Sequence, residues 1–282
     1  MGERTVDAWF ASMPAAVGRQ RGLLERLLAA VAAEPATTAF VLSCSLARGA
    51  GDAWSDVDAG VAVDDAYWPD AVAVVVRLVR DLGQVADVLV QHWPPGQPGD
   101  STHVFAQYAD GLQLSLVVRP ASQWQGRAPG EMVLYDPGGA FTGDRTPAVL
   151  RASADDVREW AFLGWIALAD LVKYVDRRSA WEALARLDDA RAQAWRLWAV
   201  AAGLDYPTFG LTAVLDDPAA GTPPGIEATV ARLDLDALLA AARRLAEVLD
   251  DAAARAAAVV PAELPHGMAR HVRGLLHRAV PE

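Results

Sequence analysis

The chain has 282 residues, of which 53% are hydrophobic, and this is enough material for one large domain or two modest ones. Its formal net charge of −11 excludes general affinity for nucleic acid, because an acidic surface repels the phosphate backbone. The single cysteine excludes an intramolecular disulfide. The apolar runs are too short to cross a membrane, so we expect no membrane partner. Because no signal-peptide pattern is found either, we expect a cytoplasmic protein.

The first half of the chain predicts a sheet with helices. Apolar residues at helical spacing predict helix over most of 5–33 and over 69–82. Runs rich in β-branched residues predict strands at 38–42, 57–63, 84–91, 102–108 and 112–118. Asp110 and Gly111 stand between the last two strands and predict a tight hairpin turn.

The second half of the chain predicts helices. The stretch 121–146 is rich in glycine and proline, with one short apolar piece at 132–135, and we interpret it as the connection between two domains. Helical periodicity follows at 157–174, 181–202, 235–257 and 261–279. The spacing of five tryptophans is typical of a bundle core: Trp160, Trp165, Trp181, Trp195 and Trp198. The sequence therefore predicts an α+β domain over 1–146 and a helical domain over 147–282.

The chemically informative stretch runs from residue 41 to residue 63. The first strand ends near Ser45, a turn of mostly small residues follows, and the next strand opens with Ser55, Asp56, Val57 and Asp58. Alternation along a strand places Asp56 and Asp58 on one face. Two carboxylates so placed repel each other and invite a hard divalent cation such as Mg²⁺, although solvated carboxylates at a strand end are the alternative interpretation.

Ser45 adds a phosphate-binding element to this pair of carboxylates. At the start of a short helical turn, it offers its hydroxyl and backbone N–H groups to a phosphate. A metal held by Asp56 and Asp58 would then neutralise the charge of a polyphosphate whose tail the turn holds. The stretch thus predicts a site for a triphosphate and a metal ion.

The run 45–49, Ser-Leu-Ala-Arg-Gly, followed by Ser-Asp-Val-Asp at 55–58, resembles the signature of the polymerase-β nucleotidyltransferase superfamily. More narrowly, the chain is similar to bacterial aminoglycoside nucleotidyltransferases, and the resemblance continues through 87–91, the hairpin 110–116 and the region of Lys173. The resemblance implies a mixed sheet with helices, followed by a helical bundle. It also implies transfer of a nucleoside monophosphate, with ATP as the expected donor, to a hydroxyl of a small molecule such as an aminoglycoside.

The same resemblance suggests roles for individual residues. Asp56 and Asp58 would ligate Mg²⁺, Ser45 would hold the triphosphate, and Lys173 would contact a phosphate from the helical domain, in a cleft between the domains. Arg48 would touch a phosphate or brace the turn through a nearby carboxylate. The alternative for Lys173 is an ion pair with Asp170, three residues earlier on the same helix.

Two residues depart from the family pattern. Cys44 stands where the family has a glycine, and Ser115 stands where it has a third carboxylate. Leu114 and Leu116 are expected to face the core, which leaves Ser115 on the opposite face with the aspartates. A serine cannot act as a carboxylate base toward an acceptor hydroxyl, and general-base action is worth roughly 10²–10⁴-fold in rate.

Three explanations of the missing carboxylate remain open. Asp87, which we place on a neighbouring strand, or Asp170, on a helix, would replace it as a catalytic group. Alternatively, the protein binds a nucleotide without turning it over. In the third explanation Cys44 is a nucleophile with a depressed pKa in a different reaction, whereas its simpler interpretation is a small residue that tolerates a glycine position. Trp54, just before the Asp56 and Asp58 pair, is interpreted as a packing residue rather than a stacking platform.

Overall fold

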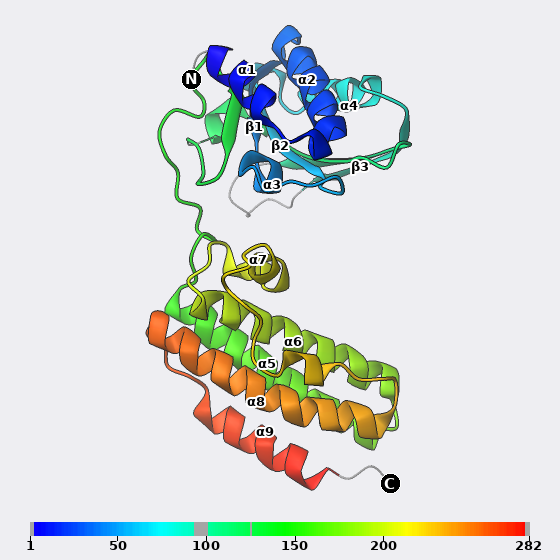
Figure 1. The fold of residues 1–282 in the computed structure, drawn as a ribbon, viewed down its shortest axis with the longest axis vertical. Coiled ribbons are helices and arrows are strands. Elements are labelled where there is room, and N and C mark those ends of the chain that lie inside the picture. The colour runs from blue at the N-terminus through cyan, green and yellow to red at the C-terminus, as the bar shows by residue number, and fades with distance from the viewer. Residues whose placement is uncertain (1–2, 93–100, 125, 280–282) are drawn as a thin grey trace. The chain divides into compact units, whose positions relative to one another are not determined.

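The computed structural model describes residues 3–92, 101–124 and 126–279, and the chain divides into two compact units, Met1–Thr146 and Pro147–Glu282 (Figure 1). The first unit combines a six-stranded sheet with helices, and the second is helical. The predicted α+β class is confirmed. In the described part of the chain, no helix is both long enough and apolar enough to cross a membrane.

The sheet of the first unit has the strand order β3-β4-β5-β2-β1-β6. Its strands are β1 (Thr37–Leu42), β2 (Val57–Val63), β3 (Val85–His92), β4 (Thr102–Tyr108), β5 (Gln113–Pro120) and β6 (Met132–Tyr135). β2 and β5 run parallel, and every other neighbouring pair is antiparallel, so the sheet is mixed as expected. Asp110 and Gly111 form the predicted hairpin turn: the Gly111 backbone has φ +91° and the Asp110 carboxylate accepts from the Leu112 N–H at 3.1 Å.

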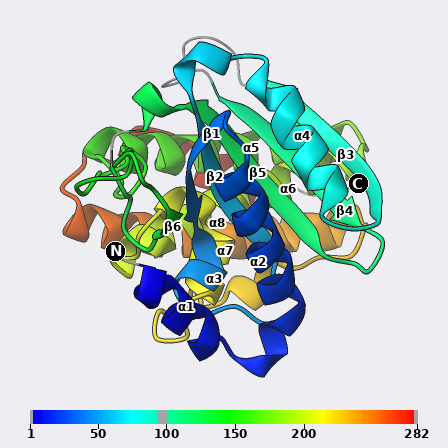
Figure 2. The same cartoon turned by 90° about the horizontal axis from the view of Figure 1, so that it is seen from above.

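Two helices, α2 (Gly18–Ala33) and α4 (Ala71–Asp81), lie over one face of this sheet (Figure 2). Shorter helical elements are α1 (Glu3–Ser12), η1 (Ala15–Val17), α3 (Cys44–Ala47), η2 (Asp65–Tyr67) and η3 (Ala121–Gln123). The helix expected over most of 5–33 is divided into α1 and α2, with η1 between them. Pro14 stands at the break, and it cannot continue the hydrogen-bond ladder because it lacks a backbone N–H.

Side-chain alternation divides the sheet into a covered face and an open face. On β5, Leu114 and Leu116 are buried against the helices, as predicted, whereas Ser115 points to the opposite side. The Tyr108 hydroxyl, on the covered face, donates to the Val79 carbonyl in the last turn of α4 at 2.9 Å. The same carbonyl accepts from the Leu82 N–H at 3.4 Å, so the Tyr108 hydroxyl adds a second bond at the C-terminal end of α4.

The segment 121–146 is part of the first unit and not merely a connection. Its strand β6 pairs with β1, and its side chains Trp124 and Phe141 pack edge to face on one part of the open face. Gly60 on β2 lies under this indole, and a Cβ there would come within 2.5 Å of Trp124. The sequence interpretation missed this role because the segment's glycines and prolines hide its few apolar contacts.

The second unit is a bundle in which α5, α6 and α8 pack on one another and α9 packs on α5 and α8. Its elements are α5 (Ala154–Asp176), α6 (Ala180–Ala201), η4 (Pro207–Phe209), α7 (Leu211–Leu215), η5 (Ile226–Thr229), α8 (Leu235–Val259) and α9 (His266–Arg278). Trp160, Trp165 and Trp195 are buried in its core, as expected. The prediction is wrong for Trp181, which is 72% exposed at the first turn of α6.

Candidate functional site

The candidate site begins with the short helix α3 between β1 and β2. The Ser43 N–H donates to the Asp58 carbonyl at 2.8 Å, so the chain leaves β1 beside the start of β2. Cys44 then adopts φ +58°, in the left-handed region where glycine is free of the Cβ clash. This backbone conformation explains physically why a glycine suits the position. Ser45 follows within α3, and its carbonyl accepts from the Ala50 N–H at 2.9 Å, which closes the turn.

Asp58 is the centre of the site. It stands opposite Ser115 in the parallel register of β2 and β5, and it accepts hydrogen bonds from the Ser115 hydroxyl and the Cys44 thiol. Burial and the negative charge of Asp56 raise the pKa of Asp58, whereas the two hydrogen bonds and the charge of Arg48 oppose that rise. The structure thus brings Asp58 close to Ser115 and to the charges of Asp56 and Arg48.

Cys44 lies at this site as a protonated thiol. Desolvation, the charge of Asp58 and the hydrogen bond to it raise the pKa of the Cys44 thiol to about 12. A thiolate is the nucleophilic form of cysteine, and almost none is present at neutral pH with such a pKa. The prediction of a depressed pKa for Cys44 is therefore wrong, and a nucleophilic role for Cys44 loses the argument that supported it.

Asp87 does not take the place of the third carboxylate. It lies on the edge strand β3, and both β4 and β5 separate that strand from β2. Three strand spacings amount to roughly 14 Å, too far for one metal ion to bridge Asp87 and Asp58. The expectation that Asp87 sits on a neighbouring strand is wrong, because the hairpin of β4 and β5 inserts between β3 and β2. The Asp87 carboxylate, which is exposed, accepts from the Val88 N–H at 2.8 Å.

Lys173 and Asp170 belong to α5 in the second unit. The Lys173 ammonium group forms an ion pair with Asp170 at 2.6 Å and lies 4.8 Å from the centroid of the Tyr174 ring. This is the alternative that the sequence offered for Lys173. The phosphate contact of Lys173 and a catalytic role for Asp170 stay predictions.

The residues of the first unit fit a magnesium ion that also binds phosphate. Among residues 3–92, 101–124 and 126–279, no cluster of three or more His, Cys, Asp or Glu side chains is arranged to hold a metal. Mg²⁺, however, is usually bound through one or two carboxylates together with substrate phosphates and water. The effect of Asp56 on the pKa of Asp58 shows that their negative charges are close and only partly neutralised. Such a pair suits a cation that arrives with its nucleotide.

One supporting residue escaped the sequence analysis. Gln20 on α2 is fully buried, and its amide nitrogen donates to the carbonyls of Asp52, Ala53 and Ser55 at 3.2, 3.2 and 3.0 Å. It therefore fixes the turn that leads into Asp56. The sequence does hold a signal for Gln20. It stands three residues before Leu23 and seven before Leu27, so a polar residue occupies a position of the apolar stripe of α2.

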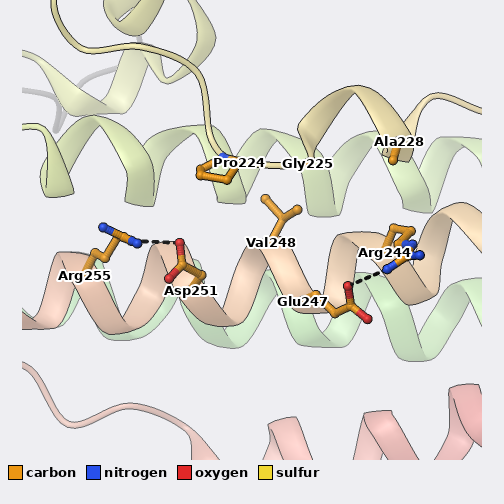
Figure 3. A pocket seen from close by; sticks show the side chains of 8 residues that line it. All are labelled: Pro224, Gly225, Ala228, Arg244, Glu247, Val248, Asp251 and Arg255. Atoms are coloured by element: carbon orange, nitrogen blue, oxygen red, sulfur yellow. Dashed lines mark hydrogen bonds and ion pairs between the residues drawn. The ribbon is translucent and has the colours of Figure 1, made fainter.

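A cavity of about 470 Å³ lies in the second unit beside α8 (Figure 3). Its rim carries two ion pairs, Arg244 with Glu247 at 3.0 Å and Arg255 with Asp251 at 2.8 Å. Val248 and Pro224 line it between them. Because these charged groups already pair with each other, we do not assign this cavity a role in the chemistry.

Comparisons with known proteins add distant likenesses to solved structures. No family model matches the chain, and no curated protein matches it. An aminoglycoside 6-adenyltransferase from Bacillus subtilis is similar in structure, with 12% sequence identity and a TM-score of 0.39, over 89% of this chain and 96% of that one. A nucleotidyltransferase-like protein from Exiguobacterium sibiricum is also similar, with 13% identity and a TM-score of 0.36, over 86% and 78% of the two chains. Likenesses at this level decide nothing about the activity of this chain.

Proposed function

We propose that this protein is a nucleotidyltransferase that transfers a nucleoside monophosphate from a nucleoside triphosphate, expected to be ATP, to a hydroxyl of a small molecule. One observation carries the proposal: Asp58 stands in register with Ser115, next to the charge of Asp56 and beside Ser43 and Cys44, where the turn that contains Ser45 begins. The sequence motif, which pairs these two aspartates with a serine-led turn, supports the same proposal. An amino sugar such as an aminoglycoside is the acceptor that the resemblance suggests.

The chain's own residues would bind and orient the reactants. Asp56 and Asp58 would hold Mg²⁺, which when bound supplies positive charge to the triphosphate. Ser45 and Arg48 would hold the phosphate tail, and Ser115 would fix the orientation of the Asp58 carboxylate through its hydrogen bond. The acceptor oxygen bonds to the α-phosphorus, the bond from that phosphorus to the oxygen bridging the β-phosphate breaks, pyrophosphate leaves, and the hydroxyl proton passes to solvent water. Ser115 cannot take that proton, so we expect slow transfer.

Ser115 also favours a second candidate function. A protein with the carboxylate pair but no third carboxylate would bind a nucleotide without transferring it, and would act as a sensor or scaffold. The two functions share the binding site and differ only in turnover. A binding measurement therefore tests the site, and product formation separates the functions.

Calorimetric titration with ATP and GTP, in Mg²⁺ and in chelator, tests the site. We expect binding that depends on Mg²⁺ and is lost in Asp58→Asn. Asp87→Asn is the matched control, because it removes an exposed carboxylate far from β2, and it should bind as the wild type does. Binding of neither nucleotide to the wild type would overturn both functions.

The substitution Ser115→Asp separates transferase from binder. If the missing carboxylate limits transfer, this variant should release pyrophosphate faster in a panel of hydroxylated acceptors, by up to roughly 10²–10⁴-fold. Ser115→Asn, of similar size but uncharged, is the control for a change of shape. Equal rates in all three proteins would mean that the third carboxylate does not limit turnover.

A further inference from the structure

The indole of Trp54 is the most exposed large hydrophobic side chain in the described part of the chain, at 93%. The interpretation of Trp54 as a packing residue is therefore wrong. A tryptophan side chain offers 150–250 Å² of surface for burial, and leaving all of it in water forgoes a large stabilisation. An exposed indole beside a site is thus better explained by a ligand than by the fold.

The turn that carries Trp54 is held in place. The Asp52 carboxylate accepts from the Trp54 N–H at 2.8 Å and from the Ser55 hydroxyl at 3.1 Å, and the Asp52 N–H donates to the Ser55 hydroxyl oxygen at 2.9 Å. The buried Gln20 amide binds three carbonyls of the same turn from below. The indole is therefore presented by a backbone that is ordered before any ligand arrives, which reduces the entropy cost of binding.

Among the described residues, no cation lies over the faces of this indole. Elsewhere a guanidinium or ammonium group lies over the rings of Trp124, Trp160, Trp165, Tyr174 and Trp198. No such partner is found for Trp54 among the described residues, and the Asp52 carboxylate beside it is engaged within its own turn. A flat, uncharged π system would therefore find an open surface on this ring.

We propose that Trp54 is the surface on which the base of the bound nucleotide stacks, a proposal that rests on the proposed nucleotide site. Trp54 precedes Asp56 by two residues, so its Cα lies within about 7 Å of the Asp56 Cα. A triphosphate anchored at Ser45 and at the metal of Asp56 and Asp58 brings its base into this neighbourhood. Stacking on one indole tolerates every base, so the preference among bases should be weak.

Two ligands that differ only by the nucleoside test this assignment. Mg²⁺–ATP and Mg²⁺–tripolyphosphate are titrated by calorimetry into the wild type and into Trp54→Ala. We expect Trp54→Ala to lower the affinity for ATP by about tenfold or more and to leave the affinity for tripolyphosphate unchanged, because stacking acts on the base alone. Trp54→Phe should restore most of the ATP affinity. Trp181→Ala, which removes another exposed tryptophan, is the control and should bind both ligands as the wild type does.

Each other outcome overturns the assignment. If the affinities for ATP and tripolyphosphate fall equally, Trp54 supports the turn and does not stack on the base. If the affinity for neither ligand falls, the nucleotide site binds without Trp54. A loss of affinity confined to an amino-sugar acceptor would mean that the indole contacts the acceptor instead of the base. If the wild type binds neither ligand, the proposed function fails and the stacking role fails with it.

Discussion

The two faces of the first unit's sheet are made by alternate residues of the same strands, yet they differ in almost every physical property. On β5, Leu116 is fully buried under the helices, while its neighbour Ser115 reaches the Asp58 carboxylate on the open face. Burial of the apolar residues fixes the strand register, because a slip by one residue would expose them all. The positions of the polar groups on the other face follow from that register. Chemistry on the open face can therefore change without a change of fold.

The pair Leu116→Ala and Ser115→Ala gives the largest contrast between the faces. Leu116→Ala leaves a cavity in the core and should lower the free energy of unfolding by about 2–5 kcal/mol. Ser115→Ala removes one hydroxyl from the open face and should cost no more than about 1 kcal/mol. Chemical denaturation of the two variants measures the difference. Equal losses would mean that the open face also holds the sheet together.

Tyr108 extends the comparison to the contact between the covered face and α4. Burial raises the pKa of Tyr108 to about 12 from its usual value of 10.0, so the folded protein keeps a proton that the unfolded chain loses above pH 10. The stabilisation is complete below that pH and declines as the pH rises toward 12, by about 2–3 kcal/mol in all. Tyr108→Phe should cost about 1 kcal/mol at neutral pH and should flatten this alkaline decline. Unfolding curves from pH 8 to 12 test both expectations.

Asp58→Asn should have a smaller effect on stability, and of the opposite sign. The raised pKa of Asp58 means that the folded protein binds this proton more tightly than the unfolded chain does. Stability from this group is fully present at pH values below the usual aspartate pKa, and it declines as the pH rises through the raised pKa of the folded protein. Without metal, Asp58→Asn should therefore melt at a slightly higher temperature than the wild type, and should lose the stabilisation that Mg²⁺ with ATP provides. A lower melting temperature would mean that the carboxylate stabilises the fold.

Much of the first unit was predictable from local patterns. The strand 57–63 and the hairpin at Asp110 and Gly111 were predicted correctly, because each depends on alternation or on turn chemistry within a few residues. The place of Asp87 was not, because strand order is set by long-range pairing. Alternation along each strand could assign a face to Asp58 and to Ser115, but it could not show that the two residues stand opposite each other. That register came from the structure.

Residues that act through a single distant contact were hardest to predict. The exposure of Trp54 depends on a turn held by Gln20, more than thirty residues earlier in the chain. The raised pKa of Cys44 comes from burial first, and then from the charge of Asp58 and the thiol's hydrogen bond to it, which no local sequence pattern predicts. A helical turn beside a cysteine suggested activation, whereas the carboxylate beside it has the opposite effect.

The close approach of Gly60 to Trp124 decides where the protein can be cut. A fragment that ends at Pro120 would keep five strands, but it would lose the indole over Gly60 and the strand that pairs with β1. The face of the sheet at Gly60 and the edge of β1 would then be exposed to water. The unpaired edge of β1 could form hydrogen bonds with a strand of another chain. Such a fragment should aggregate, and excision of the first unit for separate study belongs at Thr146.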